Sequence, residues 1–103
     1  MTYIEELKDV IRKLHGADAT HVETVPVKET FEGKTVWEGD IEVFELHGHS
    51  TATRLYAWSH DTGDPRMPKR HLTVLHLGPV TSAITALRAV LIQEFRNAET
   101  EES

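Results

Sequence analysis

The residues best suited to chemistry in this sequence are its histidines, of which the chain of 103 residues has seven. His47 and His49 are two positions apart, so both would project to one side of an extended chain. His60 and His71 flank a long loop, where Asp61 or Asp64 would complete a metal site of two histidines and a carboxylate. No tight ligand signature such as HExxH is present. We therefore predict no metal site and interpret the histidines as hydrogen-bonding or solvated side chains at strand ends.

Other patterns that carry chemistry are missing from the sequence. Cysteine is absent, which excludes thiolate metal sites and cysteine nucleophiles. The six glycines are dispersed, so no phosphate-binding loop, dinucleotide fingerprint or serine nucleophile elbow occurs. The segment 61–64 has the aspartates and glycine of a calcium loop but lacks the ligand spacing of an EF-hand. We predict no catalytic residues and no cofactor, and favour a protein that is not an enzyme, although the sequence leaves that question open.

Composition and charge predict one small domain. The chain has no apolar run of the roughly 18 to 20 residues that a membrane span needs, and its acidic N-terminus is unlike a secretory signal. The absence of cysteine permits a reducing compartment. We expect a single soluble domain over residues 1–98, a disordered acidic tail over 99–103, and a cytoplasmic location.

Hydrophobic periodicity predicts two helices around a run of strands. The first helix has a capping box at Thr2 and Glu5 and a stop at Gly16. Pro26 places the first strand at a sheet edge, and Gly39 is expected to bend the second strand. The fold class is α+β in the order α-β-β-β(-β)-α, an antiparallel meander sheet of three to four strands with the N- and C-terminal helices packed on it. The predicted elements are helices over 2–15 and from about 79 or 81 to 97, and strands over 20–30, 35–47, 52–60 and 70–77.

The register of the second and third strands follows from matching their side chains. Setting Glu45 opposite Arg54 also brings apolar residues together on both faces of the sheet, and sliding one strand by one residue destroys both sets of matches. The matched pairs are Val43 with Tyr56, Ile41 with Trp58, and Phe44 with Leu55.

This register leaves one apolar face of the sheet in need of a cover. Helices commonly gather on one face of an antiparallel sheet, here the face with Phe44, Leu46, Leu55, Ala57, Leu75 and Leu77. The other face carries Trp37, Ile41, Val43, Tyr56, Trp58, Leu72 and Val74. Exposed apolar patches mark partner or ligand surfaces, and tryptophan and tyrosine are enriched at interface hot spots. The alternative is that strong twist, the long loop or one helix on each face covers this surface within the monomer.

Three functions are compatible with the sequence. The first is association through the apolar face, either as a homodimer or with a larger protein partner. The second is binding of a small molecule, or a minor enzymatic activity, in an apolar pocket rimmed by histidines. The third is binding of an acidic partner or nucleic acid by the basic cluster of Arg66, Lys69 and Arg70.

Nucleic-acid binding is the least favoured of the three. The formal net charge of −6 argues against a surface built to neutralise phosphates. The order α-β-β-β-α is similar to that of double-stranded RNA-binding domains. That resemblance implies a fold analogy without the function, because the segment 78–83 at the start of the second helix has no lysine for the phosphate contacts.

Overall fold

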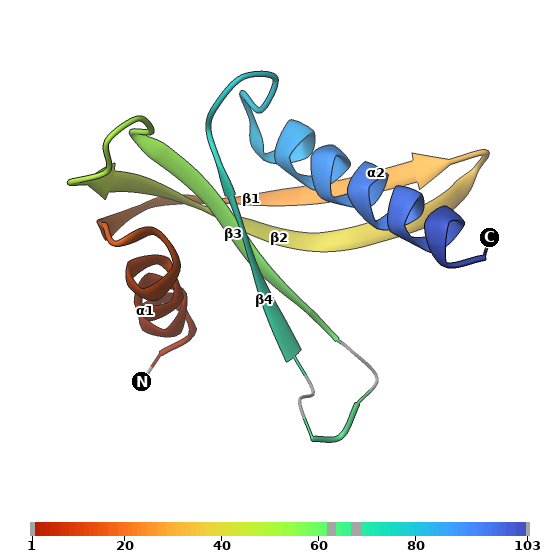
Figure 1. The fold of residues 1–103 in the computed structure, drawn as a ribbon, viewed down its shortest axis with the longest axis horizontal. Helices are drawn as coiled ribbons and strands as arrows, with labels where there is room; N and C mark the ends of the chain where they lie inside the picture. Colours follow the sequence, from red (N-terminus) through yellow and green to blue (C-terminus); the bar gives the residue numbers. More distant parts are fainter. Residues whose placement is uncertain (1, 62–63, 67–68, 103) are drawn as a thin grey trace.

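The computed structural model describes residues 2–61, 64–66 and 69–102, and the side chains of 2–60, 64–66 and 69–93. Within these residues, four strands form one antiparallel sheet in the order β1-β2-β3-β4, which confirms the α+β class (Figure 1). Neither helix in the described part is long and apolar enough to cross a membrane. The elements are α1 (Tyr3–His15), β1 (Asp18–Phe31), β2 (Lys34–His47), β3 (Arg54–Asp61), β4 (Lys69–Leu75) and α2 (Ala83–Glu102).

Helix α1 begins and ends where its local signals predicted. The Thr2 hydroxyl accepts a hydrogen bond from the backbone N–H of Glu5, and the Glu5 carboxylate accepts one from the backbone N–H of Thr2, both at 3.2 Å. This capping box satisfies two donors that the start of a helix leaves free. Gly16 ends the helix in the left-handed conformation with φ of 64°, and its N–H donates to the carbonyl of Arg12.

Strands β1 and β2 form a long hairpin that turns at Glu32 and Gly33. Both residues have positive φ, 51° and 78°, as a tight two-residue turn between twisted strands requires. β1 lies at the edge of the sheet, as Pro26 predicted, because proline has no N–H to donate to a second neighbour.

The bend expected at Gly39 is not found there. Gly39 pairs with Val27 inside the ladder, and the two register irregularities fall elsewhere, at Val22 in β1 and at Val36 in β2. The glycine instead makes room for the Trp37 ring, because a Cβ at position 39 would lie 3.0 Å from the nearest ring carbon.

The ladder between β2 and β3 is short and has the predicted register. Among the described residues its pairs are Glu42 with Ala57, Val43 with Tyr56, Phe44 with Leu55, and Glu45 with Arg54. The expected pair of Ile41 and Trp58 does not form, because each strand follows its outer neighbour there, Ile41 beside Val25 and Trp58 beside Leu72. The sheet therefore opens into a fork with the β1–β2 hairpin as one prong and the β3–β4 hairpin as the other (Figure 1).

The two helices cover opposite faces of the sheet, which corrects the expectation that both lie on one face. Leu7 and Ile11 of α1 pack on the face that carries Phe44 and Leu55. Helix α2 packs on the other face. Because both faces carry large apolar side chains, one helix on each face removes both from water. The division of sheet residues between the faces is as predicted, except that Leu77 lies beyond the end of β4 and is exposed.

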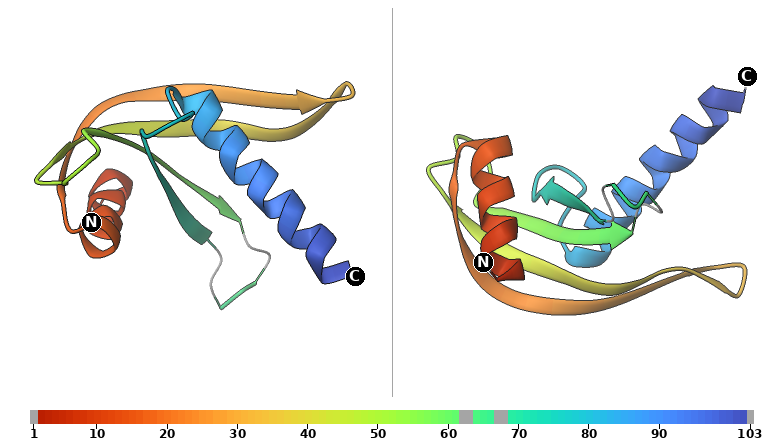
Figure 2. Two further views of the ribbon diagram at one scale, coloured as in Figure 1. Left: turned by 45° about the horizontal axis from the view of Figure 1, so that its top comes forward. Right: turned by 90° about the horizontal axis from the view of Figure 1, so that it is seen from below.

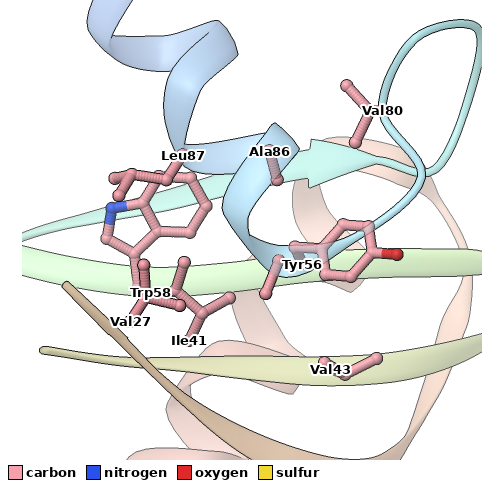
Figure 3. Close-up of a cluster of buried hydrophobic side chains, with 9 residues drawn as sticks. Val27, Ile41, Val43, Tyr56, Trp58, Val80, Ala86 and Leu87 are labelled. Carbon is pink, nitrogen blue, oxygen red and sulfur yellow. The ribbon is translucent and has the colours of Figure 1, made fainter. Parts of the chain in front are cut away.

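The face predicted as an interface is core within the single chain. Trp58 is only 1% exposed and packs in one cluster with Ala86 and Leu87 of α2 (Figure 3). Of the remaining predicted residues, Ile41, Val43 and Tyr56 are buried in the same cluster, and Trp37, Leu72 and Val74 are partly buried against it. This face is therefore covered by α2 and is not a free surface.

Helix α2 contacts the sheet through its first turns and then projects beyond it (Figure 2). Arg88 and Glu29 form an ion pair that ties the helix to β1. At its start, the Thr85 hydroxyl accepts hydrogen bonds from the backbone N–H groups of Thr81 and Ser82. The helix continues to Glu102 and so includes most of the segment expected to be a disordered tail.

Candidate functional site

The opening of the fork forms a pocket of about 530 Å³ beside the first residues of α1. We term it the fork pocket. Because β2 and β3 do not pair here, side chains from both strands reach the same space. Its lining residues are Tyr3, Trp37, Glu38, Gly39, Asp40, Glu42, Ser59, His60 and Lys69.

One wall of the fork pocket is aromatic and fixed in place. The Trp37 ring lies over Gly39 and meets Trp58 edge to face, with ring centroids 6.3 Å apart and an interplanar angle of 68°. Tyr3 adds a second aromatic side chain from the start of α1. Aromatic faces that are held in position can attract a cationic group by their quadrupole.

A buried carboxylate, Glu42, forms part of the floor. Its side chain is 7% exposed and accepts hydrogen bonds from the Thr24 hydroxyl and, at 2.9 Å, from Nε2 of His21. A buried carboxylate needs such partners, because desolvation without them is costly. The arrangement fixes the Glu42 side chain between β1 and the pocket.

The charges around the fork pocket are mainly negative. Its lining includes three carboxylates, those of Glu38, Asp40 and Glu42, against the single lysine Lys69. Burial raises the pKa of the Tyr3 hydroxyl, a hydrogen bond with Ser59 lowers it, and the carboxylates of Glu42, Glu6 and Asp40 raise it again. The net rise keeps Tyr3 protonated at neutral pH, so its hydroxyl is available as a donor.

A chain of polar side chains leads from the fork pocket through β3 and β4 and back to α1. The Tyr3 hydroxyl lies 3.0 Å from Oγ of Ser59, and Ser59 Oγ is hydrogen-bonded to Nδ1 of His71. Nε2 of His71 faces the Glu6 carboxylate at 4.0 Å. Ser59 and His71 are directly opposite each other in the β3–β4 ladder, while Tyr3 and Glu6 lie one turn apart at the start of α1. A hydroxyl, an imidazole and a carboxylate thus stand in sequence beside a pocket.

Five of the other histidines are hydrogen-bonded to side chains or backbone groups, most of them distant in sequence. His60 and His71 occupy adjacent ladder positions that alternate between the faces of the sheet, so they do not converge on one ion. In the part of the chain with described side chains, no group of three metal ligands occurs. The partners are Thr73 for His15, Glu42 for His21, Thr20 for His47, the backbone N–H groups of Thr51 and Ala52 for His49, and Tyr56 for His76.

The predicted basic cluster is not assembled on one face. Lys69 and Arg70 are consecutive residues of β4, so their side chains project to opposite faces, and Lys69 lines the fork pocket. Arg66 lies in an exposed turn in which its N–H donates to the Asp64 carboxylate at 2.9 Å. Residues 62–63 and 67–68 of this loop lie outside the described residues. Binding of nucleic acid by the cluster stays a prediction.

A second pocket, of about 490 Å³, lies between β1 and the start of α2. Its charged lining residues have both signs, among them Glu23 and Arg54. Burial raises the pKa of Tyr56 at its base, Arg54 lowers it and Glu23 raises it. Because the opposing charges favour neither an anion nor a cation, this pocket is a weaker candidate than the fork pocket.

The polar chain of Tyr3, Glu6, Ser59 and His71 was not predicted, because its members are far apart in sequence and form no local motif. Extending the register to the third and fourth strands would have placed Ser59 opposite His71. No pattern in the sequence predicts that α1 lies beside Ser59 and His71. The chain matches no family model, and no curated protein or solved structure matches it either.

Proposed function

We propose that the protein binds a small organic molecule that carries a positive charge, and that the molecule occupies the fork pocket. The observation that carries this proposal is the composition of the pocket wall, in which Trp37 and Tyr3 stand with three carboxylates. A volume of about 530 Å³ lies in the range of ligand sites, about 300 to 1,000 Å³. Aromatic faces and carboxylates both favour a cation.

Small-molecule binding is favoured over association through the sheet face because α2 covers that face. Trp58 and its neighbours are buried in the single chain and have no surface to offer a partner. The fork pocket, by contrast, is open to solvent and is lined by the ends of β2 and β3 that lie beyond their short ladder.

Binding is tested by titrating the full chain with tetramethylammonium and with spermidine while tryptophan fluorescence and thermal stability are recorded. A ligand present at 100 times its Kd stabilises the folded state by about 2.7 kcal/mol. Replacing Asp40 by asparagine is expected to weaken binding several-fold, because one carboxylate charge leaves the pocket wall. Glu45→Gln is the matched control, since this exposed carboxylate lies outside the pocket. Equal affinity for acetate and for the two cations, or no binding of either cation, would refute the proposal.

A second candidate function, self-association, is favoured by a different observation. The turn end of the β1–β2 hairpin and the C-terminal part of α2 both extend away from the rest of the molecule (Figure 2). The hairpin carries the exposed apolar residues Phe31 at 67% and Val36 at 48%, and α2 carries Ile92 at 54%. We propose a second copy of the chain as the occupant, because each copy offers both a projecting hairpin and a projecting helix, as an isologous interface requires.

Light scattering at several protein concentrations tests the dimer. Ile92→Asp is expected to reduce a dimeric mass to that of the monomer. Leu14→Asp provides the control, because Leu14 is 64% exposed on α1, at the other face of the sheet. A monomeric mass for the unmodified chain at 1 mM would dispose of this candidate, since it would place the Kd above about 1 mM.

A further inference from the structure

We infer that Ser59 is a nucleophile for acyl transfer with His71 as its general base, and that the substrate class is an ester whose alcohol or acyl part is positively charged. This inference rests on the proposed function, because it takes the fork pocket as the substrate site. It adds a reaction to what would otherwise be a binding site.

The first support is the direction of the hydrogen bonds. We assign the proton of the neutral His71 ring to Nε2, because that nitrogen faces the Glu6 carboxylate at 4.0 Å, and this assignment leaves Nδ1 as the acceptor for the Ser59 hydroxyl. The Tyr3 hydroxyl, held protonated by its surroundings, then donates to Ser59 Oγ at 3.0 Å. A serine hydroxyl that donates to a neutral imidazole is the arrangement that activates a serine nucleophile.

The second support is that Ser59 lines the fork pocket and is not sealed between secondary structure elements. A second hydroxyl–imidazole pair in the molecule lacks this access. Thr73, two residues beyond His71 on the same face of β4, also bonds an imidazole, that of His15 at 2.9 Å. The Thr73 and His15 pair ties the other end of α1 to the sheet and lines neither pocket described above. The Ser59 and His71 pair has the same kind of hydroxyl–imidazole hydrogen bond, and its serine also lines the fork pocket, where a ligand can reach it.

The proposed reaction proceeds in two balanced stages. Ser59 Oγ attacks the carbonyl carbon of the ester and its proton passes to Nδ1 of His71. The bond from that carbon to the alcohol oxygen then breaks, and His71 returns the proton to the leaving alcohol. In the second stage water attacks the acylated serine, His71 takes one proton from the water, and the bond to Ser59 breaks with return of that proton to Oγ. The products are the alcohol and the carboxylic acid.

The negative charge that forms on the carbonyl oxygen also needs a donor. The Tyr3 hydroxyl is close enough to Ser59 Oγ to reach an oxygen bound to the attacked carbon, and Lys69 supplies the positive charge in the pocket lining. Glu6 is a positioning residue in this scheme, because it orients the imidazole and does not meet the substrate.

The test uses the full chain and a fluorophosphonate probe, which reacts with activated serine hydroxyls regardless of ligand charge. We expect one label, located at Ser59 by mass spectrometry of the digested protein. Ser59→Ala should abolish labelling, and His71→Gln should slow it by about a hundredfold or more, as loss of a general base does. Thr73→Ala is the control and should label like the unmodified chain, because it removes only the comparison hydrogen bond.

Turnover is measured with acetylthiocholine and with the neutral ester phenyl acetate. We expect the cationic ester to have the higher kcat/KM. Glu6→Gln should lower kcat about tenfold or more with little change in KM while its circular dichroism stays that of the unmodified chain, because a smaller folded fraction would also lower the apparent kcat. Circular dichroism of each variant shows whether it is folded. If Ser59→Ala does not fold, the site of labelling in the unmodified chain still decides the question.

The outcomes separate the two proposals. Absence of labelling above the level of the urea-unfolded chain, or labelling at another residue, rejects the nucleophile even if tetramethylammonium binds. Labelling at Ser59 without binding of either cation supports the nucleophile and rejects the charged ligand.

Discussion

Replacing Leu87 by alanine tests whether α2 is the cover of the sheet face that holds Trp58. Leu87 is almost completely buried in the same cluster as Trp58 and Ala86 (Figure 3). The substitution removes three carbon atoms, and their transfer from water accounts for about 2.4 kcal/mol at about 0.8 kcal/mol per methylene. The cavity left behind raises the loss, and such truncations cost about 2.7 to 5 kcal/mol.

The loss is measured by urea unfolding, followed by tryptophan fluorescence. For a domain of about this size, 1 kcal/mol corresponds to about 4 °C or more in Tm, so Tm should fall by about 10 °C or more. Leu14→Ala is the matched control, because it makes the same truncation at a leucine of α1 that is 64% exposed, and it should cost less than about 0.5 kcal/mol.

Two results would refute this reasoning. A loss at Leu87 no larger than that at Leu14 would mean that the first turns of α2 do not pack on the sheet. The Ile92→Ala variant lacks an apolar side chain on the projecting part of α2. If its stability rises with protein concentration, a second molecule helps to cover the sheet face that holds Trp58.

Three further predictions follow from local features. Gly39→Ala places a Cβ against the Trp37 ring, so we expect a loss of about 1 to 3 kcal/mol and a shift of the tryptophan emission, both recorded in one unfolding series. Burial lowers the pKa of His15 below its usual 6.5, and the neighbouring His49 lowers it further. The unfolded chain therefore binds more protons than the folded chain. The stability that is present above pH 6.5 is lost as the pH falls through that value toward the folded pKa. Unfolding midpoints at pH 7.5 and 5.5 should show this loss, and His15→Gln should reduce it. Thr2→Ala removes the helix cap and should cost about 1 kcal/mol, seen as a lower urea midpoint with an unchanged slope.

The features predicted correctly from the sequence are those set by neighbours in the chain or by direct pairing. The start and end of α1 depend on Thr2, Glu5 and Gly16, each within one turn of the boundary. The β2–β3 register depends on side chains on both faces of two strands, and a slip of one residue would have exposed both sets.

The placement of α2 was not predictable in this way. Its apolar stripe would fit either face of the sheet, and the choice is made by the path of the chain after β4, where Gly78 turns with φ of 58°. The fork was not predicted either. The residues on both sides of Gly39 have the pattern of a strand, and nothing in that pattern indicates that the twist of the sheet separates β2 from β3 there. The polar chain of Ser59 and His71 required both the ladder and the position of α1.

The short ladder between β2 and β3 also bears on how the chain folds. Each hairpin closes between neighbouring strands and is local in sequence, and such units form within microseconds. Within the ladder, Val43 and Tyr56 belong to the core under α2, whereas Phe44 and Leu55 belong to the core under α1. Neither core can close until the two hairpins meet, and their meeting brings both cores together in one step. The four ladder pairs are thus the point at which folding becomes cooperative across the molecule.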